Sequence, residues 1–106
     1  MSWIYLIIAG LFEIGWPLGL KLSQTKANFK IYGISLSVLA MILSGYFLWM
    51  AQKEIPIGTA YAVWTGIGAV GTLIIGIIFF GDSSNILRLL SASLIIIGIV
   101  GLKLAN

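Results

Sequence analysis

The chain has 106 residues, of which 60% are hydrophobic and only 8% are charged, and its formal net charge is +3. A soluble domain carries about 25% charged residues, so these charges are too few to cover the surface of a water-soluble protein of this size. Histidine and cysteine are both missing from the sequence, which excludes disulfides, thiol nucleophiles, zinc sites built from these residues and histidine-based acid–base catalysis. The composition predicts a membrane protein that is not an enzyme, binds no metal and needs no cofactor.

Four apolar stretches follow one another along the chain, which we expect to form a single transmembrane domain over residues 1–106. A hydrocarbon core of about 30 Å is crossed by about 20 helical residues. The predicted transmembrane helices cover about residues 3–21, 31–52, 56–80 and 87–104. The connections between them are short, so neighbouring helices should run antiparallel. We therefore expect an all-α protein, a bundle of four transmembrane helices, in a prokaryotic plasma membrane (the cell inner membrane).

Turn-forming residues mark the expected ends of the later helices. Pro56 suits the first turn of the third helix, and Gly81 is a predicted helix stop. Either Asp82, Ser83 or Ser84 should then cap the fourth helix.

Glu13 lies in the middle of the first apolar stretch. A charged carboxylate at that depth costs about 2.5–3.5 kcal/mol on insertion scales, and such residues usually face a cavity or a partner on the path of an ion, proton or cation. The other acids, Glu54 and Asp82, fall in predicted loops. A protonated Glu13 that only joins two helices by a hydrogen bond is the alternative, but the position favours transport.

Aromatic and hydroxyl side chains accompany Glu13. Trp16 follows it by about one turn, and Tyr61 and Trp64 share a face of the third helix. Aromatic faces attract cations, although Trp and Tyr also anchor helices at membrane interfaces. Ser44, in the middle of the second helix, can hydrogen-bond either a carboxylate or a helix backbone. The predicted substrate- and proton-binding residues are Glu13, Trp16, Ser44, Tyr61 and Trp64.

Small residues are frequent in the third helix, and the fourth helix alternates small and large residues. Gly66 and Gly68 are expected to form a hinge, because glycine lowers the stiffness of a helix; close packing is the alternative. The fourth helix has no ionisable residue between Arg88 and Lys103, so we expect it to serve assembly. The predicted dimer interface consists of Ser91, Leu94, Ile95 and Gly98.

A dimer is expected because one carboxylate in four short helices cannot enclose a cation. Two protomers would place two Glu13 side chains across one cavity. Four lysine or arginine residues flank the spans on the side of the first and third loops, and two flank them on the other side. This weak bias permits both orientations in the membrane. The same basic residues account for the net charge, so no nucleic-acid partner is expected.

Two segments of the chain are similar to the small multidrug resistance family of four-helix exporters, and the likeness extends over almost all 106 residues. They are residues 9–13, Ala-Gly-Leu-Phe-Glu, and residues 56–68, Pro-Ile-Gly-Thr-Ala-Tyr-Ala-Val-Trp-Thr-Gly-Ile-Gly. Within the family, the chain is most similar to the guanidinium exporter subtype. Trp16, residues 68–71 and the ending at residues 98–103 carry this similarity. Pro17 departs from the pattern, since this position is usually small or aliphatic in the family.

The resemblance implies an antiparallel dimer that exchanges protons for cationic substrates at two shared Glu13 carboxylates. It implies a proton-coupled antiporter for guanidinium or small guanidinyl cations, with Trp16, Ser44, Tyr61 and Trp64 as the hydrogen-bonding and packing shell of Glu13. Four alternatives stay open: a quaternary ammonium or multidrug exporter, one subunit of a paired heterodimeric exporter, a structural subunit of a larger complex, and a small ion channel.

Overall fold

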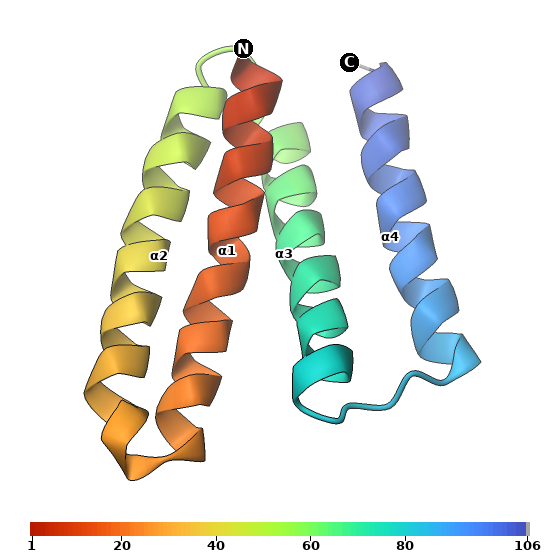
Figure 1. Ribbon diagram of the computed structural model, residues 1–106. Coiled ribbons are helices and arrows are strands. Elements are labelled where there is room, and N and C mark those ends of the chain that lie inside the picture. The colour runs from red at the N-terminus through yellow and green to blue at the C-terminus, as the bar shows by residue number, and fades with distance from the viewer. Residues whose placement is uncertain (106) are drawn as a thin grey trace.

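The computed structural model describes residues 1–105 of the chain. It contains four long helices, α1 (Ser2–Thr25), α2 (Lys30–Ala51), α3 (Ile57–Phe79) and α4 (Ile86–Ala105), with a short 3-10 helix, η1 (Ala27–Phe29), before α2 (Figure 1). All four long helices are long and apolar enough to cross a membrane. The predicted fold class, an all-α protein with four transmembrane helices, is confirmed.

The helices stand in a row rather than in a closed ring (Figure 1). Helix α1 packs against both α2 and α3, and α4 packs against α3. The Cα atoms span 45 × 34 × 17 Å, so the protomer is much thinner in one direction than in the other two. Both termini and the α2–α3 connection lie at one end, here called the terminal end. The η1 segment and the α3–α4 connection lie at the other, the loop end.

Two glycines bring the backbones of α1 and α2 together near the loop end. A Cβ atom placed on Gly19 would lie 2.5 Å from the carbonyl oxygen of Gly33, and a Cβ atom on Gly33 would lie 2.5 Å from the carbonyl oxygen of Gly19. Since the obstructing atoms are backbone, no side-chain rotation would make room. Only glycine permits this approach, which is how helices associate in lipid.

Two serines of α2 reinforce the same pair of helices. Ser37 donates its hydroxyl to the carbonyl oxygen of Trp16, and Ser44 donates to the carbonyl oxygen of Ala9 at 2.7 Å. Ser37 and Ser44 are seven residues apart in α2, and their acceptors are seven residues apart in α1. The two bonds therefore repeat along the contact between α1 and α2. The stretch of α1 that carries Glu13 lies between them.

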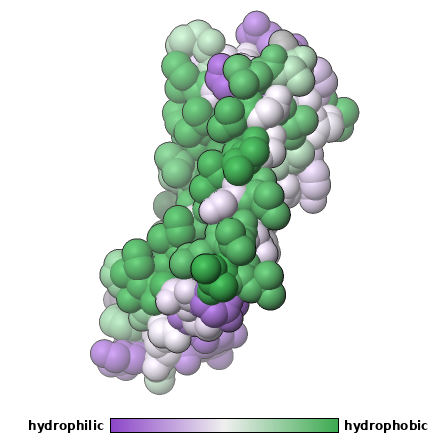
Figure 2. Space-filling model, turned by 90° about the vertical axis from the view of Figure 1, so that its right-hand side faces the viewer, coloured by the Kyte–Doolittle hydropathy of each residue, from purple (hydrophilic) through white to green (hydrophobic). Residues whose placement is uncertain are grey.

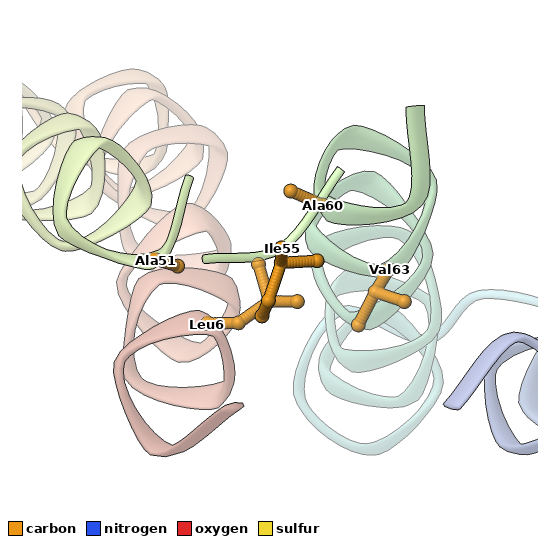
Figure 3. Close-up of a cluster of buried hydrophobic side chains, with 5 residues drawn as sticks. All are labelled: Leu6, Ala51, Ile55, Ala60 and Val63. Atoms are coloured by element: carbon orange, nitrogen blue, oxygen red, sulfur yellow. The ribbon is translucent and has the colours of Figure 1, made fainter. Parts of the chain in front are cut away.

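A cluster of buried apolar side chains packs α1, the end of α2, the α2–α3 connection and α3 together at the terminal end (Figure 3). Its members are Leu6, Ala51, Ile55, Ala60 and Val63. Next to this cluster, the buried Ser2 donates a hydrogen bond of 2.8 Å to Glu54. The start of α1 is therefore tied to the α2–α3 connection by both apolar and polar contacts.

The helix boundaries match the sequence signals in part. Pro56 directly precedes α3. Gly81 has a positive φ of 72°, and the N–H of Asp82 bonds back to the carbonyl oxygen of Gly76 at 3.0 Å, so the helix stop at Gly81 is confirmed. The predicted cap of α4 at Asp82, Ser83 or Ser84 is wrong. Asn85 accepts the backbone N–H of Arg88 at 3.0 Å instead, because the extended segment after Gly81 delays the next helix until Ile86.

Candidate functional site

A groove of about 480 Å³ between α1 and α3 contains Glu13. Helix α1 continues without a break through Pro17, which lies in the wall of this groove. The lining residues are Glu13, Trp16 and Pro17 of α1, Thr65, Gly68, Ala69, Thr72 and Leu73 of α3, and Asp82 and Arg88 beyond α3. An acid and an aromatic ring therefore share a mostly apolar groove, an arrangement suited to a small organic cation.

Glu13 is half-buried, and its side chain lies directly against the backbone of α3. A Cβ atom placed on Gly68 would lie 2.5 Å from Cγ of Glu13 and 3.8 Å from its carboxyl carbon. Trp16 follows on the same side of α1, about one turn further along, and lines the same groove. The sequence pairing of Glu13 with Trp16 is thus also a spatial one.

Three other predicted site residues form a second group. Trp64 donates its indole N–H to the hydroxyl of Ser44 at 2.7 Å. Ser44 is 1% exposed and donates its own hydrogen to Ala9, so of the two predicted partners it bonds the helix backbone and not the carboxylate. The ring of Tyr61 packs against Trp64 with centroids 5.5 Å apart, and Tyr61 itself is 57% exposed.

The two groups are joined through α1. Ala9, which accepts the bond from Ser44, precedes Glu13 by one helical turn. Ser44 and Trp64 therefore fix the helix that carries Glu13, whereas Glu13 and Trp16 form the wall of the groove.

Several lining residues were not among the predicted ones. Thr65 and Thr72 flank Gly68 at helical spacing and add hydroxyl groups to the α3 side of the groove. Their spacing around Gly68 was a usable signal. Asp82 reaches the groove because the turn at Gly81 places it against Gly76 of α3, and Arg88 reaches it from the first turn of α4. Hydropathy encodes neither position.

Helix α4 exposes most of its surface, and Figure 2 shows this side of the molecule as apolar in the middle and hydrophilic at both ends. Among the predicted interface residues, Leu94 is 68% exposed, and Ser91 and Gly98 are also exposed. Ile95 instead turns partly toward α3, since its Cγ2 would lie 3.3 Å from a Cβ atom on Gly66.

The protein-family model described as Small Multidrug Resistance protein matches residues 1–95 of the chain. The chain belongs to this family. With its four apolar helices, it is a multi-pass membrane protein.

Relatives of known name cover the chain from end to end. It is 55% identical over 106 residues to the guanidinium exporter of Proteus vulgaris, with 100% of both chains covered. It is 52% identical to the guanidinium exporter of Escherichia coli strain K12, covering 100% of this chain and 99% of the relative. A guanidinium exporter of Yersinia pseudotuberculosis is 50% identical, again with both chains fully covered. All three relatives are named as exporters and not as enzymes.

Proposed function

We propose that this protein exports guanidinium and small guanidinyl cations in exchange for protons, through a site shared by the Glu13 carboxylates of two protomers. The observation that carries the proposal is the position of Glu13, the acid of an apolar helix, in a groove with Trp16. The names of the relatives, at 50–55% identity over the whole chain, support guanidinium as the substrate.

The groove offers guanidinium what its chemistry needs. The cation is planar, so a carboxylate can accept two of its N–H groups side by side while an aromatic ring covers its face. Glu13 and Trp16 supply these two elements. When Glu13 takes a proton it loses its charge, so the cation loses its counter-ion and leaves. Competition between proton and cation for one carboxylate, in a protein that opens to one side at a time, produces exchange.

In this proposal, α3 opens and closes the two ends of the groove. Gly66 and Gly68 lie within this helix and Gly68 lines the groove, so bending there would change which end of the groove is open. Ser44 and Trp64 link α1, α2 and α3 beside the acid, and Tyr61 packs against Trp64 on α3.

A second protomer, in antiparallel orientation, completes the site. The protomer is thin and its Glu13 groove is open, so one chain does not surround a cation on its own. The exposed apolar side of α4, with Ser91, Leu94, Ile95 and Gly98, is the proposed contact. The chain has no cysteine, so a single Leu94→Cys substitution should give a disulfide-linked dimer on oxidation in membranes. The same change at Leu104, which lies near the helix end, is the control, and equal cross-linking of both would contradict the contact.

Transport in proteoliposomes containing this chain alone tests the function. Guanidinium uptake driven by a pH gradient should be robust and should disappear in Glu13→Gln. Glu54→Gln is the matched control, because it removes another carboxylate while keeping an oxygen acceptor for Ser2. Proton-coupled transport by Glu13→Gln would contradict the proposed mechanism. Equal transport of tetraethylammonium would indicate a multidrug exporter, and activity only after addition of a homologous chain would indicate a paired exporter.

A further inference from the structure

We infer that Gly68 is a positioning residue for the Glu13 side chain, so that the backbone of α3 sets the direction of the carboxylate. The inference rests on the proposed role of Glu13 in transport, and it goes beyond a hinge because it assigns Gly68 a direct contact with the acid.

The contact is close and specific. A Cβ atom on Gly68 would lie 2.5 Å from Cγ and 3.2 Å from Cβ of Glu13. Carbon atoms that are not bonded to each other pack at about 3.5–4.0 Å. Cγ is the second carbon of the side chain, so it moves only if the first torsion angle of Glu13 changes or if α1 and α3 separate. Either change redirects the carboxyl group.

The α1–α3 contact is built from several such pairs. Ile67 fits against Gly10, where an added Cβ atom would lie 2.7 Å from Cβ of Ile67, and Ile14 fits against Gly71. Glu13 occupies the middle of this series, in the socket that Gly68 provides. The acid is therefore packed like a core residue on one side and faces the groove on the other, which restricts its side chain to one direction.

The neighbouring glycine provides a matched control. A Cβ atom on Gly66 would meet the side-chain tips of Ile99 and Ile95 on α4, at 2.9 Å and 3.3 Å, and these flexible ends can move aside. Gly66→Ala and Gly68→Ala stiffen the same helix two residues apart. Only the second substitution obstructs Glu13.

The first test needs no substrate. Thermal unfolding of the detergent-solubilised protein is measured for Gly68→Ala in the wild-type background and in Glu13→Ala, which lacks Cγ. The midpoint should fall clearly in the wild-type background and fall by much less in Glu13→Ala, where only the 3.2 Å contact with Cβ of residue 13 remains. Failure of Gly68→Ala to fold, with recovery of folding in the double variant, supports the same conclusion. An equal loss in both backgrounds would overturn it, since a hinge or helix-packing role does not depend on Cγ of Glu13.

The second test measures guanidinium affinity at equilibrium by calorimetry. A side chain forced from its preferred rotamer should weaken binding by about tenfold in Gly68→Ala, whereas Gly66→Ala should stay within about twofold of wild type. A hinge role alone predicts slower transport in both variants with unchanged affinity, and that result would overturn the inference. If Glu13→Gln transports normally, the proposed function fails, but the unfolding comparison still decides whether Gly68 seats Glu13.

Discussion

The indole N–H of Trp64 donates a hydrogen bond of 2.7 Å to the hydroxyl of Ser44, and this bond links α3 to α2. The Ser44 hydroxyl in turn donates a hydrogen bond to the carbonyl oxygen of Ala9 on α1. One buried hydroxyl therefore links three helices, one turn before Glu13. In the apolar interior of a bilayer no water replaces such a partner, so the linkage should contribute to stability.

Ser44→Ala should lower the free energy of unfolding by about 1–3 kcal/mol, because it removes both bonds and leaves the N–H of the half-buried Trp64 without its acceptor. Reversible unfolding in mixed detergent micelles measures the loss. Ser35→Ala, an exposed serine of the same helix, is the control and should change stability little. Equal values for the two variants would show that the three-helix linkage contributes nothing measurable.

Ser44 also shows how much of the fold and of the site could be predicted from the sequence alone. Hydropathy and the position of Glu13 were enough to predict four transmembrane helices and to select the acid, because both signals are local. The partner of Ser44 was left as a choice between a carboxylate and a backbone. That choice depends on how α2 is rotated against α1, and the Gly19–Gly33 approach, which no periodicity displays, fixes this rotation.

Residues brought in by loop geometry were beyond prediction for a different reason. Asp82 was one of three residues expected to cap α4, but the positive φ of Gly81 turns the chain so that Asp82 lies against the end of α3 and in the groove. Arg88 reaches the groove from the first turn of α4. Short loops predict antiparallel neighbours, but they do not predict that α1 packs against α3 and places Glu13 between them.

Gly33→Ala should strongly impair folding or assembly, because the new methyl group would meet the backbone of Gly19 and Ser23, at 2.5 Å and 2.6 Å, and force α1 and α2 apart. Gly45→Ala is a control on the same helix, since a Cβ atom there has nothing within 4 Å. We expect Gly45→Ala to be neutral or to stabilise α2 by up to about 1 kcal/mol.

The yield of monodisperse protein after membrane extraction, followed by unfolding of what is recovered, measures both glycine variants. A helix-propensity effect alone would make them equally stable. If Gly33→Ala were as well folded as Gly45→Ala, the close approach of α1 and α2 would not be needed for the fold.

Leu6 and Ile7 are adjacent on α1 and similar in size, but only Leu6 is fully buried, with 0% exposure against 46% for Ile7. Lipid is as apolar as these side chains, so transfer from water distinguishes the two positions little and packing distinguishes them strongly.

Leu6→Ala should leave a cavity among Ile55, Val63 and the start of α1. In soluble cores such a change costs about 2–5 kcal/mol, part of which is a cavity term that does not require water. We therefore expect a loss of about 2 kcal/mol for Leu6→Ala and a much smaller one for Ile7→Ala, measured by reversible unfolding in the same lipid mixture. Equal losses would mean that apolar content holds the terminal end together, and that the fit of Leu6 into its cluster does not.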